Sequence, residues 1–234
     1  MSFTPYHLFK NEYKLNNLVK LYIDNDDIST DAKNGHARYH PAIMHKLKSS
    51  HYYIEMLEQE LDTIDAIKFA EAPLEVMFQV NMFMDGFFYA SGSVLDILAR
   101  EIIIYFGQSL PTRVYFETAR EILTRLHPGD PFLSRLTEPS WRNEFKNYRN
   151  ALTHELIVIT KLTGEVDIFG DSPKFKLSIP LPDDPRAEPD NRTYVRNENV
   201  LEYIKLHFKR ILILVNVIYG DLKTRIENNG SIPI

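Results

Sequence analysis

Hydrophobic residues recur at intervals of three and four over four long stretches, which is the pattern of helices with one buried face. The first stretch covers residues 41–70, and Pro41 suits its start because the first helical turn needs no N–H at that position. Further long helices are expected over residues 73–106, from about Ser140 to between 154 and 160, and over 195–227, with a shorter helix over 112–127. Long helices with short connections predict an up-and-down helical bundle.

The pattern changes after the third long helix. A β-branched run covers residues 157–160, and turn signals then separate two short apolar segments at 166–169 and 174–179. The end of the helix stays open, because Leu156 and Ile159 also fit its apolar stripe. Four prolines and several acids over residues 180–193 predict an exposed loop.

The expected fold is therefore all-α, with four long helices, shorter helices and a small β-hairpin inserted before the last helix. We expect one domain over residues 1–234, long enough for a single core. Within it, residues 1–40 form an N-terminal extension, 41–160 and 195–228 the helical bundle, and 156–193 the β insertion and loop.

Polar residues on the second long helix, which is apolar nearly all round, fall on a single stripe. Buried polar groups cost about 1–3 kcal/mol each when they have no hydrogen-bond partner, so this stripe should bond to a neighbouring helix. A structural role is favoured over a catalytic one. The stripe consists of Asn81, Asp85, Tyr89, Ser93, Asp96 and Arg100.

The third long helix has two contrasting faces. Its apolar face carries Trp141, Phe145, Tyr148 and Leu152, and its opposite face carries Asn143, Asn147, Asn150 and His154. Lys and Glu are the usual residues of a solvated helix face because they favour helices more than Asn does. Three Asn and a His are better suited to making hydrogen bonds to a group other than water.

Arg149 lies on the flank of this polar face, five residues before His154. Positions five apart on a helix point about 140° from each other, so one helix does not bring both side chains to one surface. Two copies docked through the face of Asn143, Asn147, Asn150 and His154 around a two-fold axis would bring two such pairs into one cleft, which predicts a homodimer.

The composition of the chain limits the ligands and cofactors that it is expected to bind. The net charge is −5, so any contact with RNA must be local, and basic residues near Arg149 alternate with acids. The chain has no Cys, and Gly35 and Pro41 are expected to interrupt a helix through His36 and His40, so we expect no metal or other cofactor. No secretory leader and no apolar run of membrane length is found, which predicts a cytoplasmic protein without a membrane partner.

The Arg-polar-x-x-x-His pattern of Arg149, Asn150 and His154, late in a helical bundle, resembles the signature of the HEPN superfamily (higher eukaryotes and prokaryotes nucleotide-binding). Asp96 is similar to the acidic or polar position that many HEPN domains carry opposite this motif. The resemblance covers residues 41–160 and 195–228. It implies a homodimeric, metal-independent endoribonuclease of a toxin–antitoxin or antiviral system, whose partners are RNA or a nucleotide and a cognate antitoxin or regulatory protein.

The residue types suit RNA cleavage through attack by the substrate's own 2′-OH. His154 would act as general acid and base, because its side chain titrates near neutral pH. Arg149 would stabilise the charge on the phosphoryl oxygens, and Asn150 would orient one of these groups. Asp96, Tyr148 and Thr153 are candidate supporting residues.

Other readings stay open. The chain can be a non-catalytic HEPN-like module that binds a nucleotide, binds a partner protein or dimerises. Arg149 can pair with Asp96 or Asp85 as a structural bridge, and His154 can be an ordinary helix-terminal residue. The Asn-rich face can also be simply solvated.

Overall fold

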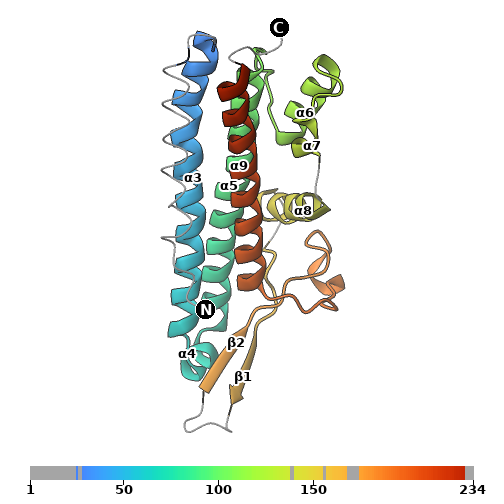
Figure 1. The fold of residues 1–234 in the computed structure, drawn as a ribbon. Helices are drawn as coiled ribbons and strands as arrows, with labels where there is room; N and C mark the ends of the chain where they lie inside the picture. Colours follow the sequence, from blue (N-terminus) through green and yellow to red (C-terminus); the bar gives the residue numbers. More distant parts are fainter. Residues whose placement is uncertain (1–24, 26–27, 138–139, 155–156, 168–173, 230–234) are drawn as a thin grey trace. The chain divides into compact units, whose positions relative to one another are not determined.

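The structure is a computed structural model and describes residues 25, 28–137, 140–154, 157–167 and 174–229 (Figure 1). Helices make up most of it, and a single hairpin precedes the last helix of the described residues, which confirms the expected all-α fold. In chain order the elements are α3 (Thr30–Thr63), α4 (Ala66–Glu71), α5 (Pro73–Tyr105), α6 (Phe116–Leu126), α7 (Leu133–Leu136), α8 (Ser140–His154), β1 (Thr163–Asp167), β2 (Lys174–Ser178), η1 (Pro189–Asn191) and α9 (Val200–Asn229).

The predicted boundaries of the first long helix are wrong. Helix α3 already begins at Thr30, so it takes up part of the expected N-terminal extension, and Pro41 lies inside it. The Ser29 hydroxyl accepts a hydrogen bond from the Ala32 N–H at 3.2 Å, which satisfies one free donor of the first turn. Packing of the buried face around Pro41 offsets the cost of a proline within a helix, about 3 kcal/mol.

Asp65 explains why the helical region ends earlier than expected. Its side chain accepts a hydrogen bond from the Lys68 N–H at 2.8 Å and so caps the separate short helix α4. An Asp in this position favours a new helix start over continuation of α3. The predicted stretch 41–70 is therefore two helices.

Contacts divide the chain into two compact units, and each takes part of α3, α5 and α9. The first unit contains α3 up to Leu47, α5 from Ser93, helices α6 and α7, and α9 from Lys209. The second contains the remaining parts of these helices, α8 and the hairpin. The expectation of one domain over residues 1–234 stays a prediction.

A buried polar cluster ties three helices together in the first unit. The Tyr219 hydroxyl donates to Glu101 Oε2 at 2.7 Å, and His36 Nδ1 bonds to the other carboxylate oxygen. His40 lies on the same face of α3, where its ring stacks on that of His36 with centroids 5.0 Å apart. The expected interruption at Gly35 and Pro41 is thus wrong, and the two histidines are polar residues of the core.

In the second unit, α8 packs through its predicted apolar face. Phe145 and Tyr148 are buried, and their rings lie 5.0 Å from Phe88 and 5.0 Å from Tyr203, respectively. This confirms the core stripe at its centre. Trp141 and Leu152, at its edges, are partly exposed.

The hairpin pairs β1 and β2 antiparallel, from Thr163 opposite Ser178 to Asp167 opposite Lys174 (Figure 1). Gly164 lies under aromatic rings, since a Cβ there would come within 2.6 Å of Phe175 and 3.2 Å of Phe69. Residues 157–160, expected to be β-structure, belong to neither strand. Their backbone instead bonds to side chains from other segments.

Candidate functional site

The two last turns of α8 carry the predicted motif, and the structure places its arginine against α5. A Cβ atom at position 92 would lie 2.5 Å from Nε, 2.6 Å from Cδ and 2.8 Å from Cζ of Arg149. The side chain therefore lies on the backbone of α5 at Gly92, and a larger residue there would require the Arg149 side chain to shift. Arg149 lies on the flank of the polar face of α8, and its side chain points toward α5.

The remaining motif residues lie near the end of α8. Asn150, one residue beyond Arg149, is partly exposed. His154 is the last residue of the helix, but its side chain lies outside the described side chains. The convergence of Arg149 and His154 on one cleft therefore stays a prediction.

Two of the supporting candidates bond within the protein. The Thr153 hydroxyl donates to the Arg149 carbonyl at 2.7 Å, one turn back along α8. The buried Tyr148 hydroxyl donates to the Pro182 carbonyl and accepts from Arg196 Nη2 at 3.1 Å. Burial raises the pKa of Tyr148, so this hydroxyl keeps its proton and joins α8 to the loop after β2.

The third supporting candidate, Asp96, is partly buried on α5 and belongs to the first unit, whereas Arg149 belongs to the second. A pairing between them stays a prediction. The rest of the polar stripe on α5 is not uniformly buried, because Asp85 and Tyr89 are exposed.

Asn81, the first residue of this stripe, has a clear partner. Its Nδ2 donates to the Ile159 carbonyl at 2.9 Å, and its Oδ1 accepts from the Ile159 N–H at 2.9 Å. The side-chain amide thus satisfies both backbone groups of one residue, as a neighbouring strand would. The described partner of Asn81 is therefore the segment that follows α8.

Arg192, in the Pro-rich loop, also donates hydrogen bonds to the segment that follows α8. It is buried, and its Nη1 donates to the carbonyls of Ile157 at 3.0 Å and Val158 at 2.9 Å. Its Nε donates to the Ala187 carbonyl at 3.0 Å. Asn81 and Arg192 together fix the path of the chain shortly after His154, a role that no local sequence pattern indicated.

An apolar recess of about 520 Å³ adjoins this segment in the second unit. Asn81 and Asp85 supply its polar lining, and partial burial raises the pKa of Asp85 above its ordinary value. The apolar lining comes from Leu74, Met77, Phe78 and Met82 on α5, and from Leu152 and Ile157.

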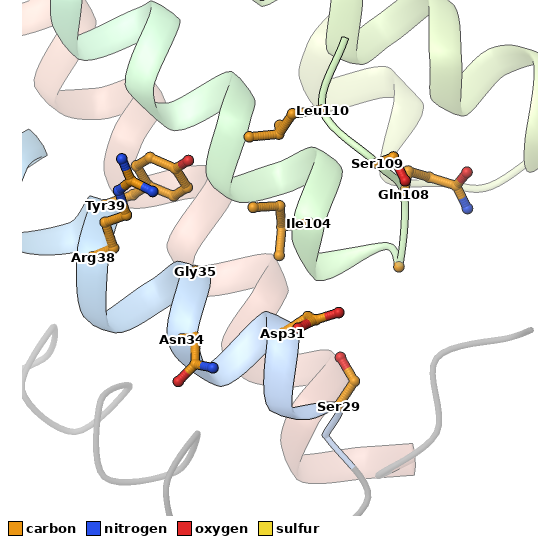
Figure 2. Close-up of a pocket in the computed structure, with 11 residues that line it drawn as sticks. Ser29, Asp31, Asn34, Gly35, Arg38, Tyr39, Ile104, Gln108, Ser109 and Leu110 are labelled. Carbon is orange, nitrogen blue, oxygen red and sulfur yellow. The ribbon is translucent and has the colours of Figure 1, made fainter.

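A second cavity, of about 600 Å³, lies in the first unit between the start of α3 and the loop after α5. Figure 2 shows Arg38 beside Tyr39 on α3, with Ile104 and Leu110 on the opposite wall. It contains none of the predicted site residues. Among the described residues, no group of three or more His, Asp or Glu side chains is arranged to hold a metal ion.

Not all basic residues near the motif can contact a ligand. Arg142 is buried, with an exposed fraction of 3%. Lys146 is exposed on the Asn-rich face of α8 and adds a cation there. The basic surface available near Arg149 is therefore small.

Within the described part of the chain, no helix is both long and apolar enough to cross a membrane. Comparison with protein-family models, curated proteins and solved structures finds no match to this chain. The functional argument therefore depends on the residues themselves.

Proposed function

We propose that this protein is a metal-independent endoribonuclease that acts as a homodimer, with one composite site formed by the α8 ends of two copies. The observation that carries the proposal is Arg149, a cation that lies against the glycine backbone of α5, five residues before the end of α8. A guanidinium and a histidine, if two copies bring them together, have the chemistry that phosphodiester cleavage needs.

In the proposed reaction, His154 removes the proton from the 2′-OH, and that oxygen attacks the adjacent phosphorus. The 5′-oxygen leaves with a proton from the histidine of the second copy or from water. Arg149 donates hydrogen bonds to the phosphoryl oxygens while their charge grows, and Asn150 orients a phosphate oxygen or the imidazole. The products are a 2′,3′-cyclic phosphate and a 5′-hydroxyl.

The test uses purified full-length protein with single-stranded RNA in excess EDTA. Cleavage should continue with the chelator and leave 2′,3′-cyclic phosphate ends. The variant His154→Ala should lower the rate by about 10²–10⁴-fold, the range for loss of a general acid or base. Cleavage by His154→Ala at the wild-type rate, or wild-type cleavage that EDTA abolishes, would contradict the proposal.

The apolar recess favours a second candidate, a non-catalytic module that binds a nucleotide or a partner protein. Its lining is dominated by exposed apolar side chains of α5 rather than by cations. Absence of cleavage on structured and unstructured RNAs, together with saturable nucleotide or protein binding that Phe78→Glu abolishes, would favour this module.

The proposed endoribonuclease, if it is a toxin or an antiviral effector, would also require a cognate inhibitor or trigger.

A further inference from the structure

The cavity between the start of α3 and the loop after α5 presents one cation and one carboxylate to the same space. Asp31 and Arg38 both line this cavity, and both are exposed. They are seven residues apart, so they occupy one face of α3, about 10 Å from each other along the helix axis. Within the described chain neither side chain forms an ion pair, and Cζ of Arg38 lies 5.5 Å from the centroid of the Tyr39 ring. Both charges are therefore open to a ligand in the cavity.

Two glycines shape this cavity. A Cβ atom at Gly35 would come within 2.9 Å of Ile104, so α3 and α5 are in close contact there. Gly107 has a φ of 69°, and a Cβ atom there would meet nothing within 4 Å, so the turn after α5 leaves open space. Figure 2 shows Ile104 between the residues of α3 and the loop that carries Ser109. The volume of about 600 Å³ lies within the range of small-molecule sites, about 300–1,000 Å³.

Uncharged polar groups line the same cavity. Nε2 of Gln108 donates to the Phe106 carbonyl at 3.2 Å, which holds the side chain in place and leaves its Oε1 as an acceptor. Asn34, three residues after Asp31 on α3, adds a second side-chain amide. A side-chain amide has both a donor and an acceptor, so it can bond to the N–H and the carbonyl of a peptide backbone. The lining thus suits a ligand with amide groups.

We infer that this cavity binds a short peptide of about three residues with free termini. Three extended residues span about 10 Å, which matches the separation of Asp31 and Arg38 along α3. The Arg38 guanidinium then donates two parallel hydrogen bonds to the terminal carboxylate, and Asp31 accepts from the terminal ammonium group. An apolar side chain in the middle of the peptide lies against Ile104 and Leu110.

This inference goes beyond the proposed function, because the cavity lies in the first unit and contains none of the residues proposed for RNA cleavage. The charges also favour a zwitterion over a nucleotide. A nucleotide or a nucleic-acid strand needs cations that neutralise its phosphates. Arg38 is the one cation of the cavity lining, and the carboxylate of Asp31 on the same face of α3 repels a phosphate.

Isothermal titration calorimetry of the full-length protein with the tripeptide alanyl-leucyl-alanine tests the site. The wild type should bind one tripeptide per chain with saturation. Arg38→Gln and Asp31→Asn should each raise the Kd by about 10-fold or more, as for loss of a charged hydrogen-bond partner. Arg113→Gln and Glu121→Gln are the matched controls, because they remove the same charges from exposed positions of the first unit outside the cavity. Both controls should leave the Kd unchanged, and circular dichroism checks that each variant is folded.

Blocked tripeptides test which end of the ligand each residue binds. The N-acetylated tripeptide lacks the ammonium group, so it should bind the wild type more weakly and lose nothing further with Asp31→Asn. The C-terminal amide lacks the carboxylate, and its weaker binding should likewise be insensitive to Arg38→Gln. This pairing of losses is the result expected for two direct contacts, since a variant with a merely structural defect would weaken all three tripeptides alike.

Absence of saturable tripeptide binding, or a Kd that neither Asp31→Asn nor Arg38→Gln changes, would overturn the inference. Binding of adenosine monophosphate that Arg38→Gln removes and Asp31→Asn strengthens, without binding of the tripeptide, would assign an anion site and would also overturn it. None of these outcomes bears on the proposed RNA cleavage, because the two sites share no residue.

Discussion

Arg149 lies on Gly92, where the missing side chain of α5 provides the space that the guanidinium and its stem occupy. The contact links the helix that carries the motif to the most apolar helix of the described chain. It also gives the glycine a physical reason to stand within a helix, where glycine is otherwise unfavourable by about 0.5–1 kcal/mol relative to alanine.

Gly92→Ala should therefore be less favourable than alanine at an open helical glycine, since the new methyl group overlaps the end of the Arg149 side chain and forces it to shift. Gly220→Ala is the matched control, because a Cβ there meets nothing within 4 Å and alanine favours the helix. It should stabilise by about 0.5–1 kcal/mol. Urea unfolding of the two variants measures both effects, and an equal gain in stability from the two substitutions would contradict the contact.

Asn81→Ala should lower the free energy of unfolding by about 2 kcal/mol, because it leaves both the N–H and the carbonyl of Ile159 without their side-chain partner. Asn143→Ala, on the exposed face of α8, should change it by less than about 0.5 kcal/mol. Chemical denaturation compares the two. Equal effects would show that the bonds to Ile159 contribute nothing to stability.

Arg149→Lys should reduce RNA cleavage by about 10²–10³-fold while the protein stays folded, because lysine keeps the charge but loses the planar pair of donors. Lys146→Ala removes an exposed cation from the same helix and should leave the rate within a few-fold of the wild type. Single-turnover cleavage assays give the ratio. A similar loss in both variants would indicate that only the general positive potential matters.

Asp183 should stabilise the folded protein at neutral pH and lose this effect in acid. A hydrogen bond from the Thr193 hydroxyl, followed by bonds from the Arg196 and Val195 backbone N–H groups, lowers the pKa of Asp183 to about 2. Because this pKa is below its unfolded value, the contribution is present above about pH 4 and is lost as the pH falls toward 2. The melting temperature of Asp183→Asn should thus lie below that of the wild type at pH 7, and the gap should close in acid. A gap independent of pH would contradict this assignment.

The sequence alone predicted the helical segments and the hairpin before the last helix. It also identified Phe145 and Tyr148 as core residues of α8, because the period of apolar side chains depends only on local backbone geometry. The sequence placed the start of α3 too late, at Pro41 instead of Thr30, because favourable packing over a long buried face outweighs the cost of a proline within the helix.

Only the tertiary structure decided the partners of the polar groups. Asn81 bonds to a residue 78 positions away, and Arg192 to carbonyls 34 and 35 positions away. The orientation of Arg149 likewise depends on Gly92, a residue of another helix. Helical spacing specifies which side of a helix a residue occupies, but the group that it meets there depends on segments that are brought together only when the chain folds.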